Sequence, residues 1–96
     1  MKIVWTKRAG RHLRAAYAYW DREKSEEAAD AMLDRILSTV ELLQQNPELG
    51  RSGRIAGTRE LALKPLPFLL AYRVGRRKIE VIALLHGARK WPTAFE

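Results

Sequence analysis

The sequence has no cysteine, no long apolar run and only two histidines. Without cysteine, the 96-residue chain forms neither a disulfide nor a thiolate metal site, which suits a reducing cytoplasm. No apolar run approaches the roughly 18 residues of a membrane-spanning helix. There is no Gly-x-Ser-x-Gly motif, and no carboxylates accompany His12 or His86 at metal-ligand spacing. We therefore expect a cytoplasmic protein without membrane contact, metal or cofactor.

Acidic residues are scarce at both ends of the chain. Residues 1–24 carry seven Lys or Arg against two Asp or Glu, and residues 51–96 carry ten against three. Residues 25–50 reverse the balance, with one arginine against six acids, and the whole chain has a net charge of +7. This pattern indicates an anionic partner on one side, either nucleic acid or an acidic protein segment. A simpler explanation of the positive charge is that it only keeps the protein in solution, since small basic domains are common.

The first half of the chain predicts one strand and two helices. Residues 2–5 alternate like a strand, and Thr6 then offers an N-cap for a helix that ends near Glu23. Ser25 is the next N-cap, and its helix must stop before Pro47 because the residue preceding a proline is pushed out of helical geometry. Two helices joined by so short a turn should form an antiparallel hairpin.

The second half predicts a loop followed by three strands. Three glycines and two arginines in residues 46–57 indicate an exposed, adaptable loop. Strands follow at 58–64, 68–74 and 79–85, and their short connections require antiparallel pairing. We expect one domain over 1–96 of class α+β and order β-α-α-β-β-β. Its helical hairpin packs on one face of a small, mostly antiparallel sheet, and the last strand is central.

The last strand turns abruptly polar where it ends. Residues 84–92 read Leu-Leu-His-Gly-Ala-Arg-Lys-Trp-Pro, which brings an imidazole, a guanidinium and an indole to one rim of the sheet. Nearby strands add further cations at Arg59, Lys64 and Arg73.

These cations have a functional and a structural interpretation. If the helices cover the opposite face, Arg73 lies on an open face that could cradle RNA, with His86 as a proton shuttle. Alternatively, Arg73 is simply a solvent-facing strand residue and His86 a hydrogen-bonded strand-end histidine. The cations Arg8, Arg11 and Arg14 are typical of a solvated helix face, and this face is also a candidate contact surface.

The order of elements and several short motifs resemble the RelE/ParE superfamily of toxins from bacterial type II toxin–antitoxin modules, which include plasmid stabilisation proteins. The resemblance spans nearly the whole chain, and each motif alone is weak. The motifs are Asn46-Pro47-x-Leu49-Gly50-Arg51, Gly57-Thr58-Arg59-Glu60-Leu61, Pro67-Phe68-Leu69-Leu70-Ala71-Tyr72-Arg73-Val74, Ile79-Glu80-Val81 and His86-Gly87-Ala88-Arg89-Lys90-Trp91-Pro92.

The resemblance implies one of two activities. RelE-like members cleave mRNA on the ribosome without a metal, whereas ParE-like members inhibit DNA gyrase. A ribonuclease of this family would use His86, Arg89, Arg73 and Lys64 here. However, Leu69 stands where the ribonuclease branch has an arginine, and Phe95 stands where it has a tyrosine or histidine. The incomplete set favours a gyrase-directed toxin that is not an enzyme, with the endoribonuclease as the alternative.

The same resemblance implies a cognate antitoxin. Its acidic or amphipathic C-terminal segment would lie over the sheet and the helix groove, where electrostatic steering would speed capture. We expect the target or the antitoxin to contact basic and aromatic residues of the sheet half, namely Arg51, Arg54, Arg59, Arg73, Arg89, Lys90 and Trp91.

Overall fold

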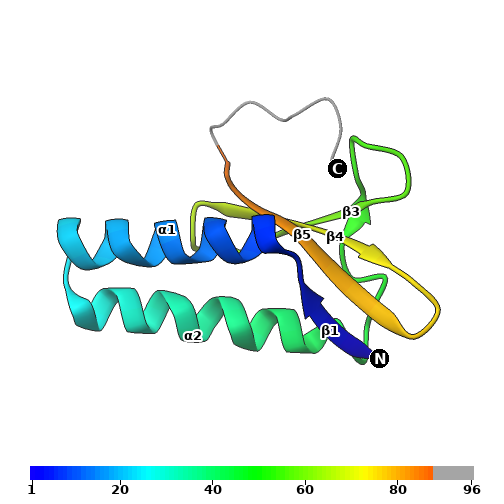
Figure 1. The fold of residues 1–96 in the computed structure, drawn as a ribbon, viewed down its shortest axis with the longest axis horizontal. Helices are drawn as coiled ribbons and strands as arrows, with labels where there is room; N and C mark the ends of the chain where they lie inside the picture. Colours follow the sequence, from blue (N-terminus) through cyan, green and yellow to red (C-terminus); the bar gives the residue numbers. More distant parts are fainter. Residues whose placement is uncertain (88–96) are drawn as a thin grey trace.

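The computed structural model describes residues 1–87 and contains two helices and five strands (Figure 1). The class is α+β, as the sequence predicted. In chain order the elements are β1 (Lys2–Trp5), α1 (Lys7–Glu23), α2 (Glu26–Leu42), β2 (Arg51–Ser52), β3 (Arg59–Ala62), β4 (Phe68–Val74) and β5 (Lys78–His86).

The five strands form one mixed sheet in the order β1-β5-β4-β3-β2. The chain from β2 to β5 runs as an antiparallel meander, whereas β1 pairs with β5 in parallel, from Lys2 opposite Lys78 to Trp5 opposite Val81. Strand β5 therefore lies inside the sheet, as its apolar sequence predicted. The prediction missed β2, because a strand of two residues is too short to show alternation.

The two helices lie side by side on one face of the sheet, and the core fills the space between the layers (Figure 1). Both predicted caps are present: Thr6 Oγ1 accepts a hydrogen bond from Ala9 N, and Ser25 Oγ accepts one from Ala28 N. The core takes Met32, Ile36 and Val40 from α2, together with alternate residues of β4 and, from β5, Ile79, Val81 and Leu84. Neither helix in the described part of the chain is long and apolar enough to cross a membrane.

A bulge in β5 changes which face its residues reach. Pairing with β4 shifts between Ala71 and Tyr72, so that Ala71 lies opposite Ala83 and Tyr72 opposite Val81. The residue skipped by this register, Ile82, packs with Ala71 and Ala83 in a second apolar cluster, separate from the main core. The face away from the helices is thus apolar near its centre.

The segment 46–57 is mostly exposed, as the sequence predicted, and it is also tied to the sheet. The buried Tyr72 hydroxyl accepts a hydrogen bond from Gly50 N at 2.8 Å and donates one to Pro47 O at 2.9 Å. A Cβ at Gly50 would lie 2.6 Å from Glu60 O, so only glycine fits there. The glycine that suggested flexibility instead permits close packing.

Candidate functional site

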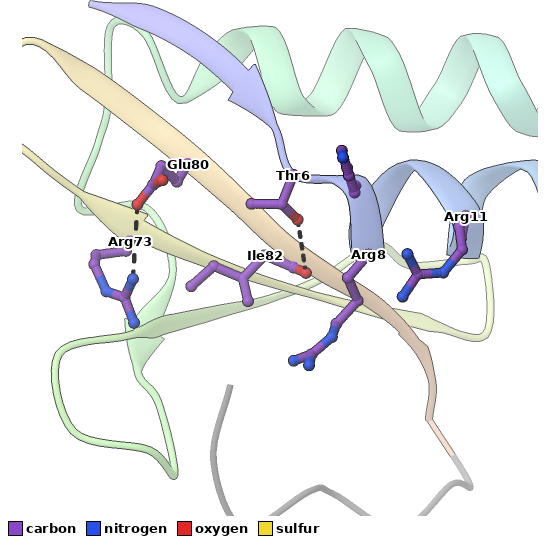
Figure 2. Close-up of a pocket in the computed structure, with 7 residues that line it drawn as sticks. Thr6, Arg8, Arg11, Arg73, Glu80 and Ile82 are labelled. Carbon is purple, nitrogen blue, oxygen red and sulfur yellow. Dashed lines mark hydrogen bonds and ion pairs between the residues drawn. The ribbon is translucent and has the colours of Figure 1, made fainter. Parts of the chain in front are cut away.

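Four cationic side chains surround a pocket of about 300 Å³ beside the start of α1. Lys7, Arg8 and Arg11 come from the first turns of the helix, and Arg73 comes from β4. Figure 2 shows Arg73 on one side and Arg8 and Arg11 on the other, with Ile82 between them. Thr6, Glu80 and Ile82 complete the lining, and we call this site the basic pocket.

Thr6 positions the helical half of the basic pocket. Its backbone N–H donates to Val81 O at 3.1 Å, and its hydroxyl lies 3.0 Å from Val81 O and 3.2 Å from Ile82 O. The same hydroxyl oxygen accepts from Ala9 N. One side chain thus starts α1 and also fixes it against β5.

Glu80 positions the sheet half of the basic pocket. It lies opposite Arg73 in the ladder, and its carboxylate is 3.6 Å from Arg73 Nη1 and 3.9 Å from Lys78 Nζ. The Arg73 side chain is 44% exposed, so this pair contributes little to stability, about 1 kcal/mol or less. Its effect is to hold the Arg73 guanidinium at the rim of the pocket.

A larger groove of about 950 Å³ runs along the second half of α1. Trp20 packs against Phe68 with ring centroids 6.4 Å apart, and Lys24 Nζ lies 5.0 Å from the centroid of the Trp20 ring. Tyr19 is 54% exposed, and this is a large fraction for an aromatic residue. We call this the aromatic groove, and it is lined by His12, Ala15, Ala16, Tyr19, Trp20, Arg22, Lys24, Pro65, Pro67, Phe68, Leu84 and His86.

The aromatic groove brings together the two histidines that are distant in sequence. His12 Nδ1 accepts a hydrogen bond from Leu84 N at 3.1 Å, so the neutral ring carries its proton on Nε2. His86 contacts the edge of Phe68, with ring centroids 6.0 Å apart. Among residues 1–87 no group of three or more His, Asp or Glu side chains is arranged to hold a metal ion.

The structure does not bring together His86 and Arg73, two of the three described members of the ribonuclease set. Arg73 pairs with Glu80, and Phe68 pairs with His86, so Arg73 and His86 lie five residues apart along the ladder, about 17 Å. Phe68 belongs to the core under the helices, so His86 lies on that side, whereas Arg73 lies on the opposite face. Lys64 is exposed in the segment between β3 and β4, and its backbone carbonyl accepts a hydrogen bond from Arg35 Nη2.

Three predicted contact residues lie in or next to the loop 46–57. Arg59 Nη1 donates to Gly50 O at 2.7 Å. Arg51 Nη2 lies 3.4 Å from one oxygen of the buried Glu60 carboxylate, and Arg54 N donates to the other oxygen at 2.8 Å. These arginines therefore have structural partners, because a buried carboxylate requires a counter-charge and hydrogen bonds.

Three other predicted contact residues, Arg89, Lys90 and Trp91, lie outside the described residues, as does Phe95. Of the polar rim that the sequence indicated at the end of the last strand, the structure therefore describes only His86 and Gly87. Burial raises the pKa of the Tyr72 hydroxyl above its ordinary value, and that hydroxyl already bridges Gly50 and Pro47. Tyr72 therefore maintains the loop and is not exposed for acid–base chemistry.

The sequence indicated Arg8, Arg11 and Arg14 as a solvated helix face and a candidate contact surface. It did not predict that Arg8 and Arg11 line a pocket with Arg73 from a distant strand, nor that α1 lines the aromatic groove. The useful signal was the lack of any acid in the first turn of α1, where helices usually carry one. The aromatic groove had no comparable signal, because its residues follow the spacing of an ordinary core-facing helix.

Comparisons with known proteins relate this chain to toxins both by sequence and by fold. A family model described as "ParE toxin of type II toxin-antitoxin system, parDE" matches residues 3–91. A Sinorhizobium fredii protein named "Putative toxin Y4kP" is 37% identical over 91 residues, which cover 95% of this chain and 93% of that protein.

Two solved structures have the same fold. One, titled "Chromosomal ParDE TA system from P. aeruginosa", superposes with a TM-score of 0.81 at 30% identity, over 88% of this chain and 92% of that chain. The second, "YoeB/ParE toxin from Agrobacterium tumefaciens", has a TM-score of 0.59 at 23% identity and covers 88% and 95% of the two chains. The chain belongs to the ParE toxin family of type II toxin–antitoxin systems, a membership that implies an antitoxin partner.

Proposed function

We propose that this protein is a toxin that inhibits DNA gyrase by binding and not by catalysis. The observation that carries the proposal is the separation of Arg73 from His86, at opposite ends and on opposite faces of the β4 and β5 ladder. General acid–base catalysis needs its groups within hydrogen-bond reach of one reacting site. In a chain of the ParE family, this separation favours the gyrase-directed branch over the RNA-cleaving one.

In the proposed system, a cognate antitoxin with an acidic or amphipathic C-terminal segment neutralises the toxin in the cytoplasm. The aromatic groove supports this partner, since Trp20, Phe68 and Tyr19 offer apolar surface along its length. Arg22 and Lys24 add positive charge at one end, where an acidic segment would be attracted. An amphipathic helix laid in a groove needs this combination of apolar and charged surface.

The decisive experiment follows two readouts in the same culture after expression of the chain alone. We expect relaxed plasmid DNA and a DNA-damage response, with mRNA on ribosomes intact. Purified toxin should inhibit supercoiling by gyrase, and coexpressed antitoxin should restore it. Intact supercoiling together with cleaved ribosomal mRNA would overturn the proposal.

The endoribonuclease is the second candidate, and the two histidines of the aromatic groove are the observation in its favour. In that mechanism His86 would move a proton, and Arg89, Arg73 and Lys64 would bind the RNA phosphate. A His86→Gln variant would then lose mRNA cleavage, while Arg22→Gln on the same groove would retain it. If wild-type protein leaves ribosome-bound mRNA intact, this candidate is excluded.

A further inference from the structure

The basic pocket has an excess of positive charge on its surface. The described lining residues include four cations, Lys7, Arg8, Arg11 and Arg73, and one carboxylate, that of Glu80. The Glu80 carboxylate lies 3.6 Å from Arg73 Nη1. Arg76, Arg77 and Lys78 are exposed at the adjoining turn between β4 and β5. The cations therefore continue from the helix across the pocket to the tip of a hairpin.

The placement of these cations works against the stability of α1. The positive end of the helix dipole lies at the first turn, where acidic side chains are stabilising and basic ones are not. The first turn of α1 contains no acid, whereas that of α2 contains Glu26 and Glu27. A bound anion would relieve the repulsion among Lys7, Arg8 and the helix dipole.

The lining of the basic pocket limits the kind of anion. Among residues 1–87, no aromatic ring lines it, so this part of the chain provides no platform on which an unpaired base could stack. Ile82 is the one large apolar residue among the described lining residues, which is too little for the apolar face of an amphipathic peptide. A row of cations without stacking or apolar surface matches the regularly spaced phosphates of a duplex.

We propose that the basic pocket binds the phosphate backbone of duplex DNA, with Lys7, Arg8 and Arg11 on one side and Arg73 on the other. Binding through phosphates is independent of sequence and falls steeply with salt. This DNA contact is additional to the proposed inhibition of gyrase and does not depend on gyrase being the target. It would allow the toxin to bind DNA directly.

The test is fluorescence anisotropy of a labelled duplex of about 20 base pairs, titrated with the purified full-length chain at several salt concentrations. The double variant Lys7→Gln/Arg11→Gln should weaken binding about tenfold and reduce the slope of log affinity against log salt by about 2. Arg73→Gln, on a different element, should weaken binding about threefold to fivefold and reduce the slope by about 1.

The matched control is Arg14→Gln/Arg35→Gln. It removes the same charge from exposed positions outside the pocket, one of them a single helical turn beyond Arg11. We expect less than about a twofold effect from this control. Equal weakening by control and pocket variants would overturn the proposal, since binding would then reflect net charge alone.

Two competing ligands give the remaining outcomes. A single-stranded RNA of the same length should bind more weakly than the duplex, and an acidic peptide should not compete at equal charge. Tighter binding of the RNA or the peptide, lost in the pocket variants, would overturn the assignment to DNA. Inhibition of gyrase by wild-type protein that does not bind DNA would contradict this inference and leave the proposed function intact.

Discussion

The two helices have the same length, 17 residues, but different roles. Helix α2 buries Ala29, Met32, Ile36 and Val40 and begins with two acids that suit its dipole. Helix α1 has one buried residue, Ala9, and begins with two cations that oppose its dipole. The basic pocket and the aromatic groove are both lined by α1, and neither is lined by a residue of α2.

This contrast separates stability from recognition. Helix α2 supplies four buried residues from one face, and substitutions there disturb a close-packed core. Most of its other residues are exposed. Helix α1 differs because its charged and aromatic side chains line two pockets that a partner could contact. We infer that substitutions on the buried face of α2 mainly change folding, whereas substitutions along the two pockets of α1 mainly change binding.

The largest effect is expected from the core face of α2. Ile36 is fully buried in the main core, so Ile36→Ala should lower the free energy of unfolding by about 2–5 kcal/mol. The adjacent Leu37 is 40% exposed, and Leu37→Ala should cost about 0.5 kcal/mol. Urea denaturation of the two variants measures both values. Equal losses of stability would contradict the assignment of Ile36 to the buried face of α2 and Leu37 to its exposed face.

The two N-caps should differ because only one is also joined to the sheet. Thr6→Ala removes the cap and the hydroxyl contact with the β5 carbonyls, and should cost about 1–2 kcal/mol. Ser25→Ala removes a cap alone, at an exposed position, and should cost about 1 kcal/mol or less. Thermal unfolding of both variants tests which loss of stability is larger. A larger loss in Ser25→Ala would contradict the role of Thr6 in fixing α1 against β5.

Exchanging the charges of the first turns should have opposite effects on the two helices. Lys7→Glu should raise the free energy of unfolding by about 0.3–1 kcal/mol, because an acid suits the N-terminus of α1, and should also weaken DNA binding. Glu26→Lys should lower the free energy of unfolding by a similar amount. Chemical denaturation at low salt measures both, and a destabilised Lys7→Glu would argue against the dipole explanation.

The smallest effect concerns a hydrogen bond between the helices. Tyr17 Oη donates to Asp30 Oδ1 at 2.6 Å, and this bond, with lesser effects of desolvation and nearby acids, raises the pKa of Tyr17 to about 12. The folded state therefore holds this proton more tightly than the unfolded state, so stability should fall as pH rises from about 10 to about 12. Ultraviolet titration should show a lower Tyr17 pKa in Asp30→Asn, and an unchanged value would contradict this cause.

Much of the fold was predictable because its signals are local. Thr6 and Ser25 were identified as caps from residue type and position, and both caps are present. The apolar second half of β5 indicated an interior strand, and the strand lies between β1 and β4. The attachment of the loop 46–57 to the sheet was not predicted, because Gly50 contacts Tyr72, a residue 22 positions later, and a glycine in the sequence does not reveal its contacts.

The candidate site was predictable only in part. Arg73 was expected on the open face and is there, but its neighbours Arg8 and Arg11 were not expected to meet it, and Lys7 was not singled out. The parallel pairing of β1 with β5 places the start of α1 beside β5, one strand away from Arg73 on β4. Pairing between segments about 76 residues apart leaves no periodic trace in either segment, so the pocket could not be anticipated.

The sequence by itself determined which segments are helical, where each helix begins, that the last strand is interior and that the two ends of the chain are basic around an acidic middle. Periodicity, capping and composition act over a few residues, so these features can be read directly. Only the tertiary structure decided which cations meet. It separated Arg73 from His86 and joined Arg73 to the first turns of α1, because strand order and the β5 bulge depend on the packing of the whole chain.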